Sequence, residues 1–123
     1  MSVFGLAGSY ISGLGMATSF YPVTESSGPF SRSRSINFTR AGIIAYTIVL
    51  RPSGITVLYT ITVDGVDVVS DVSLSSGVLI QVGGDREVDQ GSRTVTLSVV
   101  RDTGGSGWQC WNGIVVRGFW PAL

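Results

Sequence analysis

Short runs of β-branched and apolar residues, separated by turn residues, constrain the fold of this chain more than any other feature of its sequence. In residues 55–63, Ile, Val and Tyr occupy alternate positions, and Thr fills most of the positions between them. This alternation is typical of a β-strand, and the Asp64-Gly65 pair that follows favours a tight hairpin turn. No window longer than a few residues has the period of a helix. Strands with turn signals about every 8 to 12 residues predict an all-β fold, an antiparallel β-sandwich.

The same signals predict the strands and loops of the second part of the chain. The predicted strands are residues 43–50, 55–63, 66–74, 78–82, 93–101, 108–111 and 114–120. Asn112-Gly113 is typical of a hairpin turn and would join the last two strands into a second hairpin. The polar stretches 83–92 and 102–107 are predicted to be loops.

Residues 1–35 differ from the rest of the chain in composition and in residue pattern. They are rich in Gly and Ser, show no sustained period, and carry scattered apolar side chains. Flexible linkers seldom hold that many apolar residues. We therefore expect residues 1–35 to be an extended N-terminal arm that lies over its own surface or a neighbour's. Residues 36–123 are then expected to form the β-sandwich domain.

Residues 108–120 hold all three tryptophans and the single cysteine. Alternation along the expected hairpin places Trp108 and Cys110 on one face of their strand and Trp111 on the other. On the return strand, one side carries Ile114, Val116, Gly118 and Trp120. The opposite side carries Val115, Arg117 and Phe119. Both faces therefore carry large apolar side chains, whereas the terminal hairpin of a monomer should keep one face polar.

Three partners could cover the second face of this hairpin: other copies of the chain, the N-terminal arm, or a ligand. A sugar is the ligand that fits best, because a pyranose ring stacks on Trp. The simpler alternative is that the tryptophans only close one end of the chain's own core. If the chain does self-associate, the expected interface residues are Phe20, Tyr21, Trp108, Trp111, Phe119 and Trp120.

The composition bears on the same question, because only 13% of the 123 residues are charged. Soluble domains carry about 25% charged residues, and a small domain has a high surface-to-volume ratio to cover. Two explanations remain: Ser, Thr and Gly cover the outside, or part of the outside faces another subunit. We expect both to apply, and we expect an oligomer because an exposed apolar patch favours association.

The chain has no His, the side chain that general acid–base catalysis at neutral pH uses most often. A Ser or Cys nucleophile activated by His is therefore excluded. A pair of carboxylates could still hydrolyse a glycoside, but most acidic residues fall in turns, where Asp commonly bonds its own backbone. We predict no catalytic residue and no cofactor, so the chain is not expected to be an enzyme.

Two groups of carboxylates could offer oxygen ligands to calcium. They are Asp64, Asp67 and Asp71, and Asp85, Glu87 and Asp89. Neither group follows the EF-hand spacing, and Arg86 interrupts the second, so we interpret both as solvated turns and predict no metal site. Cys110 is the only cysteine, so no disulfide can form within the chain.

Charge and the N-terminal sequence restrict the partners and the location. The net charge is zero, and the one basic cluster, Arg32, Arg34 and Arg40, is a weak footprint for phosphate. We expect no nucleic-acid partner. No basic residue precedes Arg32 and glycines interrupt the apolar runs, so the segment predicts neither a signal peptide nor a membrane span. The expected site of synthesis is the cytoplasm.

One resemblance narrows these expectations. The run GSRTVTLSVVRDTGGSG…IVVRGFW resembles the closing strands of small trimeric jelly-roll domains on bacteriophage particles, in which a Gly-x-x-Thr-Val-x-Leu strand leads through a Gly-rich loop to the last strand. The pattern falls on Gly91, Thr94, Val95 and Leu97, then Gly104, Gly105 and Gly107, then residues 114–120. TITVDGVDVVSD is similar to their central hairpin. The resemblance covers residues 43–120 and implies a jelly-roll-like sandwich and a homotrimer.

Related jelly rolls serve as capsid decoration (cement) proteins, as fibre tips and as tumour-necrosis-factor-like heads on spore filaments. The resemblance therefore implies a structural virion protein that decorates a phage capsid and contacts itself and the major capsid or other virion subunits. The alternative is a fibre-tip domain that binds a host surface glycan through the tryptophans and loops 83–92 and 102–107. No functional residue of the family can be carried over.

Overall fold

The computed structural model describes residues 14–75, 80–101 and 108–121, and almost all of them lie in β-strands. The described strands are β1 (Leu14–Ser27), β2 (Phe30–Phe38), β3 (Gly42–Ser53), β4 (Val57–Val63), β5 (Val66–Leu74), β6 (Ile80–Val88), β7 (Gly91–Arg101) and β8 (Gln109–Pro121). The predicted all-β fold is confirmed, and so are the central strands at 43–50, 55–63, 66–74 and 93–101.

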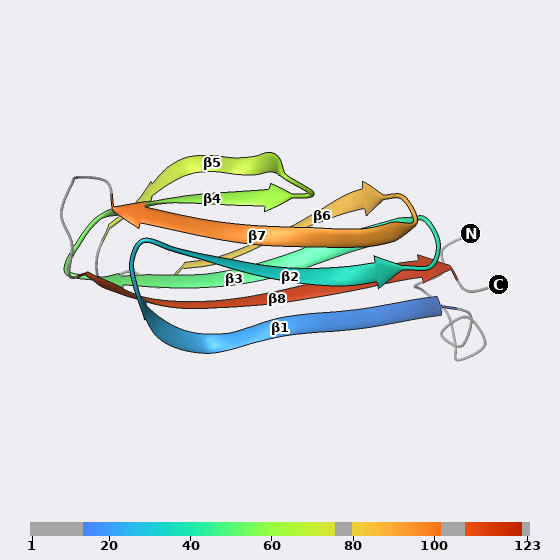
Figure 1. The fold of residues 1–123 in the computed structure, drawn as a ribbon, viewed down its shortest axis with the longest axis horizontal. Helices are drawn as coiled ribbons and strands as arrows, with labels where there is room; N and C mark the ends of the chain where they lie inside the picture. The colour runs from blue at the N-terminus through green and yellow to red at the C-terminus, as the bar shows by residue number, and fades with distance from the viewer. Residues whose placement is uncertain (1–13, 76–79, 102–107, 122–123) are drawn as a thin grey trace.

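The strands form two antiparallel four-stranded sheets that pack as a sandwich (Figure 1). Sheet A has the order β1-β8-β3-β6, and sheet B has the order β2-β7-β4-β5. Every connection except the β4–β5 hairpin crosses from one sheet to the other. Eight strands wound in this way are a jelly roll, as the sequence resemblance implied.

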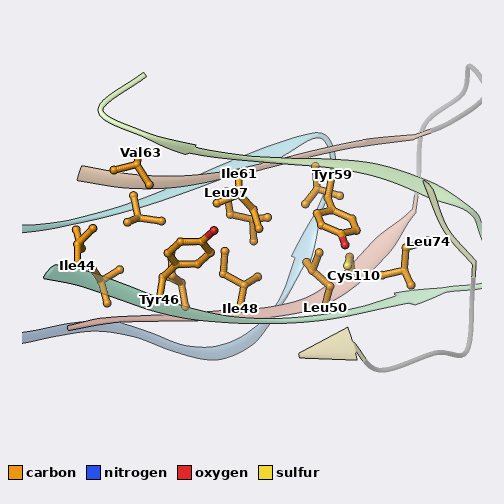
Figure 2. Packing of buried hydrophobic residues seen from close by; sticks show 14 of the residues in the cluster. Ile44, Tyr46, Ile48, Leu50, Tyr59, Ile61, Val63, Leu74, Leu97 and Cys110 are labelled. Atoms are coloured by element: carbon orange, nitrogen blue, oxygen red, sulfur yellow. The ribbon is translucent and has the colours of Figure 1, made fainter. Parts of the chain in front are cut away.

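The core fills the space between the sheets with the inward residues of alternating strands. In β3 and β4 the buried positions recur every second residue, as a two-residue period requires. Figure 2 shows side chains of β3 pointing toward those of β4 and β7: Ile44, Tyr46, Ile48 and Leu50 face Tyr59, Ile61, Val63 and Leu97. The Asp64-Gly65 turn closes the β4–β5 hairpin, and both residues have the positive φ that such a turn needs.

The described strands of the sandwich start at Leu14, well before residue 36. Residues 14–35, assigned to an arm from the sequence, form β1 and most of β2, which are edge strands of sheets A and B. The period of β1 was hidden because small residues point inward at Gly15 and Ala17 while Met16 and Phe20 point outward. Residues 1–13 lie outside the described residues, and for them the arm remains a prediction.

Two tryptophans explain why small residues point inward near the start of the chain. Trp120 is buried against Phe38, with 5.1 Å between the ring centroids, and a Cβ on Gly15 would overlap its indole. Trp108 is buried near Phe30, and a Cβ on Gly28 would overlap its indole as well. The glycines of the N-terminal segment therefore make room for the tryptophans of the C-terminal one.

The predicted hairpin at Asn112-Gly113 is wrong, because β8 is one continuous strand from Gln109 to Pro121. Neither residue has the positive φ that a type I′ turn requires. Asn112 points into the core, where its Nδ2 donates to the Thr24 carbonyl at 3.2 Å and to Ser26 Oγ at 3.0 Å. These two hydrogen bonds join Asn112 to β1, although its buried Oδ1 has no hydrogen-bond partner among the described residues, and the dipeptide extends the sheet instead of reversing it.

Residues 83–92 also differ from the predicted loop. Gly83 to Val88 continue β6, which pairs with β3 at the edge of sheet A, and Gly91 already belongs to β7. An edge strand has one side without a neighbour, and charged residues there oppose unwanted pairing. This explains why the edge strand β6 carries the charged residues Asp85, Arg86 and Glu87. The predicted loop at 102–107 lies outside the described residues.

Candidate functional site: the outer face of sheet A

The outer face of sheet A is unusually apolar for a surface that faces away from the core. Antiparallel partners share a face, so the backbone register shows which side chains lie together on it. We define the apolar face as Met16, Phe20, Val23, Ile43, Val49, Trp111, Val115 and Phe119. Met16 is 60% exposed, Phe20 61%, Val23 55% and Trp111 40%. An exposed apolar patch of this kind makes the outer face of sheet A the candidate functional site.

The charges on this face lie mostly at its borders. Glu25, Trp111 and Arg51 pair across β1, β8 and β3 near one end, and Asp85 and Glu87 lie on β6 at the edge. Arg117 is different because it lies on β8, between Thr18 of β1 and Ala45 of β3. None of these five charged side chains forms an ion pair with any residue in the described ranges.

The outer face of sheet B has the opposite character. Serines of β2 lie opposite serine and threonine residues of β7, and their hydroxyl groups hydrogen-bond across the strands. The oxygen–oxygen distances are 2.8 Å for Ser33–Thr96 and 2.7 Å for Ser35–Thr94. Thr96 in turn pairs with Thr62 of β4. Ser and Thr therefore cover the β2–β7 part of this sheet, as the composition suggested. Val66, Val72 and Val100 are also exposed on sheet B, but the exposed Met, Phe and Trp side chains of the described residues are all on sheet A.

The structure places the six predicted interface residues in three different environments. Phe20, Trp111 and Phe119 lie together on the apolar face. Trp108 and Trp120 are 3% and 9% exposed and belong to the core of the same chain. The predicted facing of residues 108–111 and 114–120 is correct, but both runs belong to one strand, so these two tryptophans close the ends of the core.

Tyr21, the sixth residue, lies at the edge of the sandwich where β1 meets β2. The Arg32 guanidinium carbon is 4.7 Å from the Tyr21 ring centroid, and that of Arg34 is 4.8 Å away. Arg34 also donates from Nε to the Phe20 carbonyl at 2.9 Å. Cation–π stacking and this hydrogen bond hold both arginines over the open edge, so they close the sandwich and protect the backbone of edge strand β1.

The first group of carboxylates considered as calcium ligands, Asp64, Asp67 and Asp71, has other partners. Asp64 accepts a hydrogen bond from the Thr94 amide at 2.9 Å and pairs with Arg93 at 3.1 Å. Asp67 accepts from the Ser70 hydroxyl, and Asp71 from the Thr60 hydroxyl. Within the described residues, no three His, Cys, Asp or Glu side chains come close enough together to hold a metal ion.

An open pocket of about 710 Å³ lies at one end of the sandwich, beside the Asp64-Arg93 pair. Val63, Val66 and Ile43 supply apolar lining, and Arg86, Glu87 and Asp89 supply charges. Because Asp64 and Arg93 already neutralise one another, the pocket has no concentrated charge of one sign. Its side chains include no arrangement of nucleophile and base.

Burial determines the ionisation of the Cys110 thiol, the one thiol of the chain. Cys110 is fully buried, and desolvation raises the pKa of its thiol to about 11. Burial likewise raises the pKa of Tyr46, an effect that Arg86 partly offsets. The Cys110 sulfur therefore stays protonated at neutral pH and serves as a small apolar group in the core.

In the described part of the chain there is no helix of the length and hydropathy that a membrane span requires.

No protein-family model and no curated protein matches the sequence. The similarities found are to solved structures, and they concern the fold. The chain in the T13 particle of infectious bursal disease virus matches 89% of this chain with a TM-score of 0.62 and 11% identity. In the VP2 subviral particle of the same virus, the TM-score is 0.56 and the identity 13%, again over 89%. The CBM36-1 domain of a multidomain xylanase from the hindgut metagenome of Trinervitermes trinervoides matches 85% with a TM-score of 0.52 and 11% identity.

The extent of these matches differs between the two kinds of neighbour. This chain spans 36% and 37% of the two viral chains but 97% of the xylanase domain. At such low identities the likeness concerns the fold alone. The chain has the jelly-roll sandwich that viral particle proteins and a carbohydrate-binding module also have.

Proposed function

We propose that this chain is a structural subunit of a virus particle, which associates with itself and with other virion subunits through the apolar face. The apolar face is the observation that carries the proposal. Exposed Met16, Phe20, Val23 and Trp111 lie on one sheet of a chain with only 13% charged residues. Exposure of such an apolar surface to water is unfavourable in free energy, and surfaces of this kind are characteristic of interaction sites. The fold shared with viral particle proteins supports the proposal.

In its finer form, the proposal follows the resemblance found in the sequence. The subunit is then a decoration, or cement, protein of a bacteriophage head, assembled as a homotrimer and located in the virion. It would reinforce the head through burial, which contributes about 25 cal/mol for each Å² of apolar area removed from water, before the costs of association are subtracted. The polar outer face of sheet B would remain in solvent.

Sedimentation velocity over a concentration series tests the proposal, with electron microscopy of any large species. We expect reversible association that Phe20→Ser weakens strongly. Val66→Ser is the matched control, because Val66 is 62% exposed but lies on sheet B. A chain that remains monomeric throughout the series contradicts the proposal. So does association that both substitutions weaken equally.

A second candidate function is carbohydrate binding, favoured by Trp111. This residue is 40% exposed and lies between Glu25 and Arg51 on the neighbouring strands, with Gln109 two residues away on the same face. An aromatic ring beside polar side chains is suited to stacking a pyranose ring while its hydroxyl groups are hydrogen-bonded. The near-complete coverage of the CBM36-1 domain supports this candidate. Trp108 and Trp120 are buried and do not take part.

A glycan screen with the native chain and the Trp111→Ala variant separates the two candidates. Binding that is lost on this substitution, in a chain that does not associate, would favour the carbohydrate-binding function. Trp111→Ala that weakens association, with no glycan bound by the native chain, would favour the structural one.

A further inference from the structure

The apolar face is a grid in which the strands are columns and the backbone register defines the rows. The columns run β1, β8, β3, β6. Three successive rows are Met16, Phe119, Ile43 and Glu87; Thr18, Arg117, Ala45 and Asp85; and Phe20, Val115, Thr47 and Gly83. Farther along, Glu25, Trp111 and Arg51 share a row. A two-fold axis along the strands, midway between β8 and β3, keeps each row and exchanges β8 with β3 and β1 with β6.

We propose that the partner of the apolar face is the same face of a second copy, related by this two-fold axis. The inference rests on the proposed function, because it takes burial of the apolar face by association as given and names the occupant. Packed sheets lie about 10 Å apart with their strands within about 30° of each other. Contacts along β8 and β3, next to the axis, are therefore the ones that the register defines best. The arrangement is two-fold and departs from the homotrimer that the resemblance implies.

Arg117 gives the strongest support for this pairing. It is the only charged residue on β8 within the grid, and it has no ion-pair partner among the described residues. The two-fold axis places Arg117 over Ala45 of the second copy, one strand away from Asp85 of that copy, or about 4.8 Å. The methyl group of Ala45 leaves space for the guanidinium. Symmetry forms this pair twice, so two arginines and two aspartates that lack partners in one copy acquire them in the dimer.

The remaining rows are complementary in shape and chemistry. Phe20, with 61% of its surface exposed, comes over Gly83 of the second copy, which has no side chain to collide with it. Arg51 comes over Trp111, where a guanidinium can stack on the indole face. Ile43 comes over Phe119. The large side chains of one copy thus meet small or apolar positions of the other.

The size of the face is sufficient for such a dimer. The rows from Trp111 to Phe119 extend about 27 Å along the strands, and four strands extend about 19 Å across. The face therefore buries about 500 Å² of each copy, or about 1,000 Å² in total, which is the smallest area expected of a biological interface and is typical of weak, reversible ones. This area fits a reversible association between like subunits.

Charge reversal tests the pairing without the need to disturb the core, because Arg117 and Asp85 are both exposed. In Arg117→Asp homodimers, aspartate would face Asp85; in Asp85→Arg homodimers, arginine would face Arg117. We expect each variant alone to associate about 100-fold more weakly than the native chain, because like charges meet twice. An equimolar mixture of the two variants should form a heterodimer as readily as the native chain forms its dimer. Circular dichroism checks that each variant is folded.

The outcomes separate this inference from the proposed function. If the native chain is monomeric, the proposed function fails and the pairing fails with it. If the native chain associates but either variant associates equally well, or the mixture gains nothing over its components, only the pairing is wrong. A native species that sediments as a trimer also overturns the pairing while leaving the proposed function in place.

Discussion

Substitution of Gly118 by Ala tests how closely the two sheets approach in the middle of the core. Gly118 lies on the buried side of β8, paired with Ala17 and Ile44. A Cβ at this position would come within 2.7 Å of Ile36 Cγ2 and 2.8 Å of Phe38 Cζ. Carbon atoms in contact are about 3.5–4.0 Å apart, so the Phe38 ring or the strand has to move. Both neighbours are buried, and neither can turn into solvent.

The expected cost follows from two opposing effects. Forcing an extra carbon into a packed core costs about 1–3 kcal/mol. Replacing Gly with Ala in an extended strand recovers about 0.4–1 kcal/mol, because the unfolded chain loses conformational freedom. We expect Gly118→Ala to lower the free energy of unfolding by roughly 1–2 kcal/mol. In a domain of this size that corresponds to a fall in Tm of about 3–8 °C.

Urea unfolding followed by circular dichroism measures this change, at one fixed protein concentration because association adds to apparent stability. Combining Gly118→Ala with Phe38→Leu identifies the cause, since the smaller side chain removes the ring atoms nearest the new methyl group. Phe38→Leu should therefore cost less in the Gly118→Ala background than in the native chain. A Gly118→Ala chain as stable as the native one, or strictly additive costs in the double variant, would refute the packing argument.

The remaining predictions concern the tryptophans, the thiol and the hairpin turn. Trp108→Ala should cost about 3–5 kcal/mol because it empties a core position, whereas Trp111→Ala should change the free energy of unfolding by about 0.5 kcal/mol; denaturant titration compares them. The Cys110 thiol, whose pKa burial raises to about 11, should not react with a thiol reagent until the chain unfolds. Because the folded state keeps this proton after the unfolded state has lost it, stability should fall between pH 9 and 11, by on the order of 2 kcal/mol, and fall less in Cys110→Ala. Asp64→Ala should lower the free energy of unfolding by about 1–3 kcal/mol, because it removes the hydrogen bond to Thr94 and leaves a positive φ, whereas Asp64→Asn should lose less in the same titration.

The fold class could be predicted because the central strands have a regular alternation and clear turns. The strand at 55–63 and the Asp64-Gly65 hairpin depend only on local chemistry, and the structure confirms both. β1 could not be recognised in the same way. Its inward position 15 is a glycine because the indole of Trp120, more than 100 positions away, fills the space where a side chain would lie. Only the tertiary structure contains that information.

The Asn112-Gly113 pair was misinterpreted for a related reason. Its local turn preference is overridden by a buried amide that bonds Thr24 and Ser26, and by pairing with strands on both sides of β8. The composition correctly indicated a surface with too little charge, but not where the apolar part lies. Signals for the apolar face do exist in the sequence: Met16 and Phe20 share a parity in β1, as Trp111, Val115 and Phe119 do in β8. The sequence alone does not show that β1 and β8 are neighbours, so it could not show that these side chains form one surface.

Oxidative footprinting at increasing protein concentration tests most directly whether the apolar face is covered by another subunit. Met16 and Trp111 are reactive side chains that are 60% and 40% exposed in the single chain. The account predicts that both oxidise more slowly as the chain associates, while the hydroxyl-rich face of sheet B keeps its solvent exposure. Association that leaves both residues as reactive as in dilute solution would contradict it.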